Sequence, residues 1–473
     1  HSRDVRLFLA RSLRGSSQPA AMGSVAVPPC HVVAMPFPGR GHVNAMLNLC
    51  RLLAARDGVS ATVVVTEEWL GLLGGPALAP GVRLEAVPNV IPSEHGRAAD
   101  WAGFVDAVYT KMEAPFERLL DRLGAAPAAI VTDTFVPGAV RAGNRRGVPV
   151  CILSALGATM FSVQYRFDRL PTAAGGSADM ADVTDPCLME NYIPGLKSTR
   201  LADLEPTHSD KIRLDKILEA YPYVRKAQCV IFTSFYELES NAIDFLRQEL
   251  PCPVFAVGPC IPFMALQENQ ANPEEESYMA WLDTQPASSV LYVSLGSFLS
   301  VSATQLDEIA IGLAQSKVRF LWVLRDKCSR VQDLIRGSDG VVVPWCDQLK
   351  ILCHPSIGGF FTHCGMNSTL EALYAGVPML TLPIAFDQPI NSRLIVDEWK
   401  VGYSLKEKAR ADGVIGRGEI AGAVKRLVNC GDGEGTRRRA SVLKEASRAA
   451  VEVGGSSDRD MVSFINYISH FKD

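Results

Sequence analysis

The sequence predicts an α/β protein made of two doubly wound parallel sheets that face a common cleft. Short apolar runs alternate with segments of helical periodicity along most of the chain, and the alternation stops at a polar stretch and then starts again. Strands that alternate with helices form parallel sheets, because each crossover helix returns the chain to the same edge. A chain of 473 residues is also too long for one core and suggests two or three domains.

Four apolar runs in the first half of the chain are expected to be buried strands. They are residues 31–35, 61–65, 129–132 and 150–153. Residues 43–56 carry apolar side chains at the spacing of one helix face and predict a helix. Residues 171–187 are small and polar, with two adjacent glycines, and predict a mobile loop.

The strand pattern resumes in the second half. The expected strands are residues 290–294, 319–324, 341–343, 360–362 and 379–382, with helical segments between them. Residues 260–276 lie between the halves, are polar and contain prolines, which is typical of a linker. Two similar α/β halves that face each other place a ligand at the carboxyl ends of their strands.

The composition excludes several classes of protein. A net charge of −4 and a pI of about 6.1 argue against a nucleic-acid partner, which would require a basic excess on one face. No run of the sequence approaches the ~20 apolar residues of a membrane span. The 12 cysteines include no C-x-x-C pair, so no zinc is expected, and scattered thiols fit a cytoplasmic protein. Residues 1–21 have the composition of a transit peptide, but we interpret them as sequence upstream of a start at Met22.

One segment, residues 345–388, places polar and aromatic side chains at the ends of successive expected strands. His363 ends a strand and Ser368 opens a helix, with Gly365 between them. A glycine in this turn lets the backbone approach a ligand closely, and the free N–H groups and dipole of a helix N-terminus favour an anion such as phosphate. His363, Asn367 and Ser368 would add hydrogen-bond donors.

Other residues of the segment suit the remaining parts of a nucleotide sugar. Trp345 offers a flat apolar face to a base, and Asp387 and Gln388 offer acceptors and donors to sugar hydroxyls. Each residue also has an ordinary structural explanation. Glu371 completes a capping box with Ser368, Asp387 can cap a helix ahead of a proline, and a single tryptophan is usually core. Together, the residues favour one nucleotide-sugar site.

This segment resembles the signature box of the plant family 1 UDP-dependent glycosyltransferases, which have the GT-B fold of two Rossmann-like domains. The resemblance runs from about Cys30 to the end of the chain. It implies that UDP-glucose is a co-substrate and that neither a cofactor nor a metal is needed. The roles it implies are stacking on uracil for Trp345, pairing with the uracil edge for the Cys346 backbone, ribose contacts for Gln348 and Glu371, diphosphate contacts for Ser297, His363, Asn367 and Ser368, and sugar contacts for Met366, Asp387 and Gln388.

The sequence departs from the usual box at two positions. Asp347 replaces a proline, which removes rigidity but no chemistry. Met366 replaces a tryptophan that helps to shape the sugar pocket, and methionine is a softer, more adaptable side chain. Because Gln388 accompanies glucose in the resembling family, we expect glucose to be preferred, by a narrower margin than in a relative with tryptophan.

A candidate catalytic pair lies in the first half. Residues 38–42 follow the first expected strand, where the resembling family carries its general base; Arg40 replaces the usual glutamine and His42 is retained. Histidine suits a base because its pKa lies near neutral pH, and the carboxylate that orients it would be Asp133, at another strand end. In-line attack on an α-linked donor would give a β-linked product, and His363 with its helix terminus would absorb the charge of the departing UDP.

The resemblance also implies a domain division. We expect an extension without ordered structure over residues 1–29, an acceptor-binding domain over 30–259, a linker over 260–276, a UDP-sugar-binding domain over 277–455 and a C-terminal helix over 456–473 that packs on the first domain. The protein is expected to be a monomer that acts on a hydroxyl of a small lipophilic acceptor.

Two other functions stay open at this point. A non-catalytic nucleotide-sugar binder could share the fold, although it would not need His42 and Asp133. A dinucleotide-dependent oxidoreductase is suggested by Gly39 and Gly41 after a strand, but Asn44 occupies the place of the third glycine of that fingerprint. The sequence has no P-loop motif.

Aromatic residues of the first half have two interpretations. Trp101, Phe104, Phe161 and Tyr165 lie in the ranges 89–104 and 155–200, which would border an acceptor pocket. Core packing explains them equally well, so they do not identify the acceptor.

Overall fold

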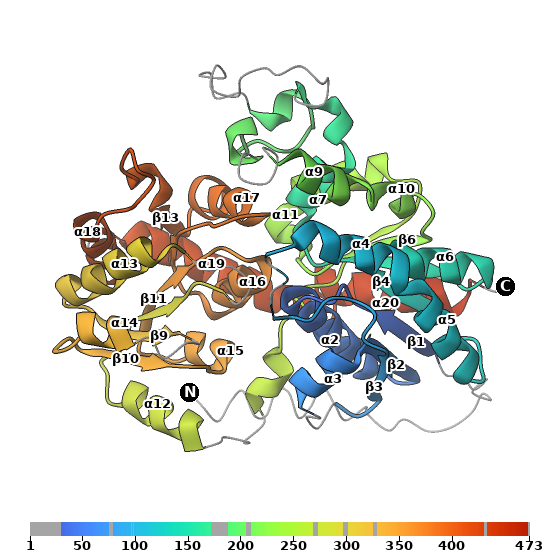
Figure 1. Ribbon diagram of the computed structural model, residues 1–473, viewed down its shortest axis with the longest axis horizontal. Helices are drawn as coiled ribbons and strands as arrows, with labels where there is room; N and C mark the ends of the chain where they lie inside the picture. Colours follow the sequence, from blue (N-terminus) through green and yellow to red (C-terminus); the bar gives the residue numbers. More distant parts are fainter. Residues whose placement is uncertain are drawn as a thin grey trace.

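The structure is a computed structural model that describes residues 30–74, 79–95, 97, 99–171, 188–204, 210–267, 273–296, 301–324, 329–429 and 433–471. The expected extension over residues 1–29, the position of Ser297 and all but the first residue of the expected loop over 171–187 lie outside the described residues. Figure 1 shows two α/β halves side by side, with helices packed around each sheet. No helix in the described part of the chain is both long and apolar enough to cross a bilayer.

The N-terminal half is built on a seven-stranded parallel sheet in the order β3-β2-β1-β4-β5-β6-β7. Its strands are β1 (Cys30–Met35), β2 (Val59–Thr66), β3 (Val82–Val87), β4 (Ala129–Asp133), β5 (Val150–Ser154), β6 (Cys229–Phe232) and β7 (Val254–Ala256). Its helices are α2 (Arg40–Ala54), α3 (Glu67–Leu73), α4 (Trp101–Lys111), α5 (Glu113–Arg122), α6 (Pro137–Arg145), α7 (Ala158–Tyr165), α9 (Lys211–Leu218), α10 (Tyr221–Val224) and α11 (Tyr236–Glu249). The four expected strands and the helix after the first are confirmed.

The C-terminal half is built on a six-stranded parallel sheet in the order β10-β9-β8-β11-β12-β13. Its strands are β8 (Val290–Ser294), β9 (Arg319–Val323), β10 (Gly340–Val343), β11 (Ile357–Thr362), β12 (Met379–Thr381) and β13 (Gly402–Ser404). Its helices are α12 (Pro273–Asp283), α13 (Ala303–Ser316), α14 (Ser329–Leu334), α15 (Gln348–Leu352), α16 (Met366–Ala375), α17 (Gln388–Arg393), α18 (Arg417–Val428) and α19 (Glu434–Val451), and α20 (Ser456–Ser469) follows them in the sequence. All five expected strands are confirmed.

Both sheets reverse their strand order near the centre. The first sheet reverses between β1 and β4, and the second between β8 and β11. Ligands bind to doubly wound sheets at the carboxyl ends of strands beside such a reversal, because the connections diverge there and leave a crevice. The two crevices face each other, since Asn367 of α16 donates a hydrogen bond to the carbonyl of Gly41 in α2 at 2.7 Å.

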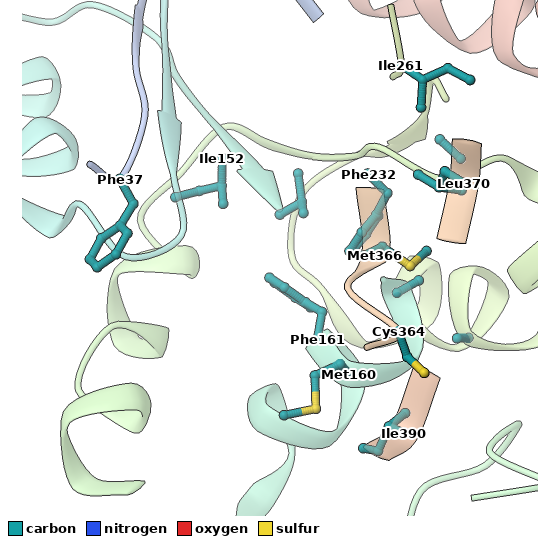
Figure 2. Packing of buried hydrophobic residues seen from close by; sticks show 14 of the residues in the cluster. Phe37, Ile152, Met160, Phe161, Phe232, Ile261, Cys364, Met366, Leu370 and Ile390 are labelled. Atoms are coloured by element: carbon teal, nitrogen blue, oxygen red, sulfur yellow. The ribbon is translucent and has the colours of Figure 1, made fainter. Parts of the chain in front are cut away.

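The halves are joined by an apolar cluster with polar contacts beside it. Figure 2 shows Phe161 and Phe232 of the N-terminal half in the same buried cluster as Met366 of α16. Arg393, at the end of α17, donates to both carboxylate oxygens of Asp203 at 3.2 Å. These contacts hold one half in a defined position relative to the other.

Helix α20 packs on the first sheet although it follows the second half in the sequence (Figure 1). Phe464 is fully buried, and its ring centroid lies 5.8 Å from that of Phe255 in β7. Tyr467 donates a hydrogen bond to the carbonyl of Gln228 at 2.9 Å. The end of the chain thus returns from the C-terminal half to the N-terminal half. The exact domain boundaries stay a prediction.

Candidate active site

The turn between β1 and α2 presents His42 at the carboxyl end of the first sheet. β1 ends at Met35, Gly39 is the N-cap with an extended backbone, and α2 begins at Arg40, so His42 lies in the first turn of the helix. Its ring packs against Phe37, with ring centroids 5.0 Å apart. Because α2 is anchored along its buried face, the fold decides where this imidazole lies.

His42 forms a hydrogen-bonded pair with Asp133. His42 Nδ1 lies 2.7 Å from Asp133 Oδ2, and Asp133 is the last residue of β4, the neighbour of β1. The Asp133 side chain is 1% exposed, and its Oδ1 accepts a hydrogen bond from the backbone of Phe135 at 2.9 Å. Since Nδ1 donates to the carboxylate, Nε2 is the ring nitrogen left to accept a proton.

The surroundings of His42 favour its charged form. Burial alone would lower the pKa of His42, but the charge of Asp133 and the hydrogen bond to it outweigh burial. Asp387 in the C-terminal half adds to them, and the pKa of His42 is raised above its ordinary value. The pair can therefore hold a proton that the imidazole takes from a hydroxyl.

The C-terminal sheet offers an anion-binding turn between β11 and α16. β11 ends at Thr362, Cys364 has a left-handed backbone with φ of 69°, and Gly365 is the N-cap of α16. The first N–H groups of a helix have no partners within the helix, and the helix dipole adds positive potential there. An anion would be stabilised in this turn.

His363 lies in the same turn between two glycines. A Cβ on Gly296 would lie 2.6 Å from His363 Nε2, and one on Gly365 would lie 2.7 Å from it, so the imidazole fits only if both residues are glycine. Burial lowers the pKa of His363 to about 4, although a hydrogen bond with the backbone of Ser294 acts to raise it. The ring is therefore neutral at pH 7. Among the described residues, its buried Nδ1 has no hydrogen-bond partner.

Asn367 connects the two helix N-termini. Its Nδ2 donates to the carbonyl of Gly41, the residue before His42, at 2.7 Å. Its Oδ1 is buried and finds no partner within the described ranges. A residue of the anion-binding turn therefore touches the turn that carries the imidazole.

Gln348, Ser368 and Glu371 form one hydrogen-bonded group between α15 and α16. Gln348 Nε2 donates to Ser368 Oγ at 2.9 Å and to the Glu371 carboxylate, and Tyr292 OH donates to Gln348 Oε1 at 3.1 Å. Burial raises the pKa of Glu371 to about 7, although the hydrogen bond from Gln348 opposes the shift. The capping-box explanation of Glu371 is wrong, because the N-cap of α16 is Gly365.

Trp345 and its two successors follow β10. The Trp345 side chain is 57% exposed, so core packing does not explain it, whereas Cys346 is buried. Asp347 is the N-cap of α15, and its carboxylate accepts a hydrogen bond from the backbone of Lys350 at 3.2 Å. The residue that replaces proline therefore supplies a helix cap in place of ring rigidity.

Asp387 and Gln388 lie between β12 and α17. Asp387 is at the N-cap position, but its side chain accepts a hydrogen bond from Asn391 Nδ2 at 2.7 Å and does not cap the helix. Burial raises the pKa of Asp387, although the hydrogen bond from Asn391 and the charge of His42 act to lower it. Gln388 Oε1 accepts two backbone hydrogen bonds from the loop before it, at 2.8 and 3.1 Å. Both lone pairs of that carbonyl are engaged, so Nε2 is the group left for a ligand.

Met366 directs its side chain into the apolar cluster between the halves. It is 4% exposed, and a Cβ on Gly157 would lie 3.2 Å from its terminal methyl carbon. Figure 2 shows it near Cys364 and Leu370. In this structure Met366 is part of the support beneath the turn.

Three of the four aromatic residues considered for an acceptor pocket are core residues. Phe104, Phe161 and Tyr165 are buried in the cluster that spans the halves. Trp101 differs, because its ring contacts Phe386 of the C-terminal half, with centroids 5.9 Å apart. Trp101 therefore lies where the two halves meet. Its partner Phe386 directly precedes Asp387 in the sequence.

A cavity of about 210 Å³ lies between α2 and α16. Asn44, Asn48 and Arg51 line it from α2, and Asn367 and Glu371 line it from α16. Polar side chains of both halves therefore face one space beside the anion-binding turn.

Two supporting residues were missed by the sequence analysis. Tyr292 holds the Gln348 carbonyl, and Asn391 holds the Asp387 carboxylate. The four-residue spacing of Asp387 and Asn391 on a helix is a signal that could have identified the second pair. The described ranges contain no group of three or more His, Cys, Asp or Glu side chains arranged to hold a metal ion.

Known proteins resemble the chain in sequence and structure. Residues 222–429 match the family described as UDP-glucoronosyl and UDP-glucosyl transferase. UDP-glycosyltransferase 87A2 of Arabidopsis thaliana is 44% identical over 447 residues, which cover 93% of this chain and 97% of the relative. Indole-3-acetate beta-glucosyltransferase of Zea mays is 31% identical over 93% and 98% of the two chains. The structure of Medicago truncatula UGT71G1 complexed with UDP-glucose has a TM-score of 0.81 and 26% identity over 93% and 98%.

These matches settle which of the three functional alternatives applies at the level of the family. The matching family and relatives are glycosyltransferases, so the oxidoreductase and the non-catalytic binder are both set aside. The two parallel sheets agree with the GT-B fold of the structural relatives. The chain belongs to the plant family 1 UDP-dependent glycosyltransferases, enzymes that transfer a sugar from a UDP-sugar to an acceptor.

Proposed function

We propose that the enzyme transfers glucose from UDP-glucose to a hydroxyl of a small lipophilic acceptor, with inversion at the anomeric carbon and without a metal. His42 is the general base, and Asp133 orients it. The observation that carries the proposal is the 2.7 Å contact between His42 Nδ1 and the buried Asp133 carboxylate. This pair lies at the strand-order reversal of the first sheet and faces the anion-binding turn of α16.

The reaction is a single in-line displacement. His42 Nε2 takes the proton of the acceptor hydroxyl as its oxygen bonds to the anomeric carbon and the bond from that carbon to UDP breaks. Attack from the face opposite UDP converts an α-linked donor into a β-linked product. Asp133 stabilises the imidazolium that forms, and the proton then passes to solvent.

The C-terminal half, proposed to span residues 277–455, binds UDP. Trp345 stacks on uracil, the Cys346 backbone pairs with its edge, and Gln348 and Glu371 hold the ribose. Ser297, His363, Asn367 and Ser368 contact the diphosphate together with the N–H groups of α16. A neutral His363 has one N–H, which the backbone of Ser294 already engages, so the ring donates to the diphosphate in its protonated form. An approaching diphosphate favours that form because its charge raises the pKa of His363 from about 4.

Asp387 and Gln388 hold the sugar, each through one kind of group. Asp387 accepts hydrogen bonds from sugar hydroxyls. We expected Gln388 both to donate to and to accept from the sugar, but its carbonyl already accepts two backbone hydrogen bonds, so it acts through Nε2 alone. Met366 influences the sugar pocket from beneath the turn, because its side chain is buried.

Named relatives support glucose as the sugar and a small organic acceptor. They include an indole-3-acetate beta-glucosyltransferase and, at 30% identity, a flavonol 3-O-glucosyltransferase of Arabidopsis thaliana. Phytolacca americana UGT2, with a TM-score of 0.80, was solved with UDP-2fluoro-glucose and pterostilbene. We assign the acceptor to residues 30–259, where His42 and Trp101 border the cleft.

The first prediction concerns the base. His42→Ala should lower turnover by about 10²–10⁴-fold, because a positioned base contributes that much. UDP affinity, measured by calorimetry, should change little, since the proposed nucleotide contacts are in the other half. The assay needs an acceptor hydroxyl of high pKa, and the exposed His470→Ala is a matched control. Near-normal turnover of His42→Ala would remove the base assignment.

The second prediction concerns pH. The base must be neutral to accept a proton, so kcat/KM should fall as the pH drops through the raised pKa of His42. Asp133→Asn removes the charge that raises this pKa. The acidic limb of the profile should therefore move to lower pH while the maximal rate falls. An unchanged limb would show that another group controls it.

The third prediction concerns the donor. Wild-type kcat/KM should be highest for UDP-glucose, ahead of UDP-galactose and UDP-xylose. Gln388→Glu keeps the acceptor for the loop but loses the amide donor, so it should cost about 1–3 kcal/mol with UDP-glucose, or roughly tenfold or more. Met366→Trp should widen the preference for glucose, with thermal stability measured alongside because a larger side chain enters a packed cluster. Preference for another sugar would contradict the donor assignment.

The fourth prediction concerns metal. Enzyme treated with EDTA and assayed without Mg²⁺ should keep its full kcat, because His363 and the N–H groups of α16 bind the diphosphate. A loss of activity that Mg²⁺ restores would mean that a divalent ion shares this role.

A further inference from the structure

Arg97 has a buried guanidinium with partners in four places. Its side chain is 1% exposed. It donates to the carbonyl of Pro38, in the turn between β1 and α2, and to the carbonyl of Pro92 at 3.1 Å. It also pairs with Glu94 at 2.7 Å and with Glu68 of α3 at 3.2 Å. A buried charge is tolerated only when it is paired and hydrogen-bonded, so this guanidinium is fixed in place and fixes its partners.

A stack of rings leads from the same guanidinium to the imidazole of His42. Arg97 lies over the ring of Phe104, 4.4 Å from its centroid. Phe104 packs edge-on against Phe37 at 5.4 Å, and Phe37 packs against His42 at 5.0 Å. Arg97 thus holds the turn by the carbonyl of Pro38 and, through Phe104, by the neighbouring ring.

The turn has backbone hydrogen bonds from Gly39 to Phe37 and from His42 to Gly39, but no side chain of the turn itself caps α2. Gly39 is the N-cap of α2, and Gly41 follows two positions later, so two of the four residues between Pro38 and Val43 are glycines with high backbone freedom. A reacting group has to be held within about 0.5 Å of its working position.

We infer that Arg97 is a positioning residue, which holds the turn between β1 and α2 so that His42 stays against Asp133. The inference rests on the proposed role of His42 as the base. Arginine suits this task because its planar fork donates in several directions at once, which the ammonium of lysine does only in part. Glu68 keeps the fork oriented, since it also accepts hydrogen bonds from the Ser93 hydroxyl and the Glu94 backbone.

The test compares Arg97→Met with Arg141→Met. Arg141 has a similar network, with Glu113 at 2.6 Å, the Tyr223 hydroxyl at 3.0 Å and a ring contact at 5.2 Å, but it joins α5, α6 and α10. Both substitutions should lower thermal stability. Only Arg97→Met should lower kcat per folded molecule, by about tenfold to a hundredfold, while the KM for UDP-glucose stays within about twofold. Arg97→Lys should restore part of the rate.

The pH profile separates positioning from a direct effect of charge. The charged groups that act on His42 are Asp133 of β4 and Asp387 before α17. A His42 that drifts from Asp133 has a lower pKa, so the acidic limb of kcat/KM should move to lower pH in Arg97→Met. Loss of a nearby positive charge alone would move the limb to higher pH.

The possible outcomes are distinct. If Arg97→Met matches Arg141→Met in kcat per folded molecule and in its acidic limb, or if the limb moves to higher pH, the inference is overturned. If Arg97→Met does not fold, Arg97→Lys and Glu94→Gln decide by the same two measurements, with smaller shifts expected in the same direction. Normal turnover of His42→Ala would instead overturn the base assignment. That measurement does not depend on any Arg97 variant, so the two failures can be told apart.

Discussion

The hydrogen bond between His42 and Asp133 joins residues 91 positions apart, and it depends on the order of the strands rather than on the local sequence. β1 and β4 are neighbours where the first sheet reverses its order, so their carboxyl ends lie one strand spacing apart, about 4.8 Å. The connections leave this point in opposite directions and open a crevice above the two side chains. In another strand order the same residues would be separated by an intervening strand.

The second sheet repeats this arrangement, and there burial opposes charge on the polar side chains of the turn and its neighbours. Burial keeps His363 neutral, and it raises the pKa of Glu371 to about 7 and that of Asp387 above its ordinary value. The diphosphate that we propose to bind here would meet the N–H dipoles at the start of α16. Preorganised dipoles in a dry cleft need little rearrangement when charge develops on the departing group, and this is the main source of electrostatic catalysis.

The sequence predicted the strands and helices that repeat along the chain and the residues of the motifs. It did not predict contacts that depend on packing between distant segments. Nine apolar strands were found, including the three-residue β12, but four were missed. β3 contains partly exposed residues, and β6, β7 and β13 have four residues or fewer, which gives a weak periodic signal. The motif residues could be placed at strand ends from spacing alone. The burial of Met366 and the contact of Tyr292 with Gln348 depend on distant chain segments that no spacing rule relates. The two backbone bonds of Gln388 are local and depend on the conformation of the loop just before it.

Asn367 makes the two halves of the site dependent on each other. Its Nδ2 is already committed to the carbonyl of Gly41, one residue from the base, while its Oδ1 is buried without a partner in the described chain. A buried acceptor without a partner costs about 1–3 kcal/mol. A hydroxyl of the UDP-sugar, unlike the diphosphate, has a hydrogen to donate to Oδ1 and would remove that cost without breaking the bond to Gly41. Nucleotide binding would then stabilise the contact between α2 and α16. The turn that carries His42 would be held most firmly when the donor sugar is present.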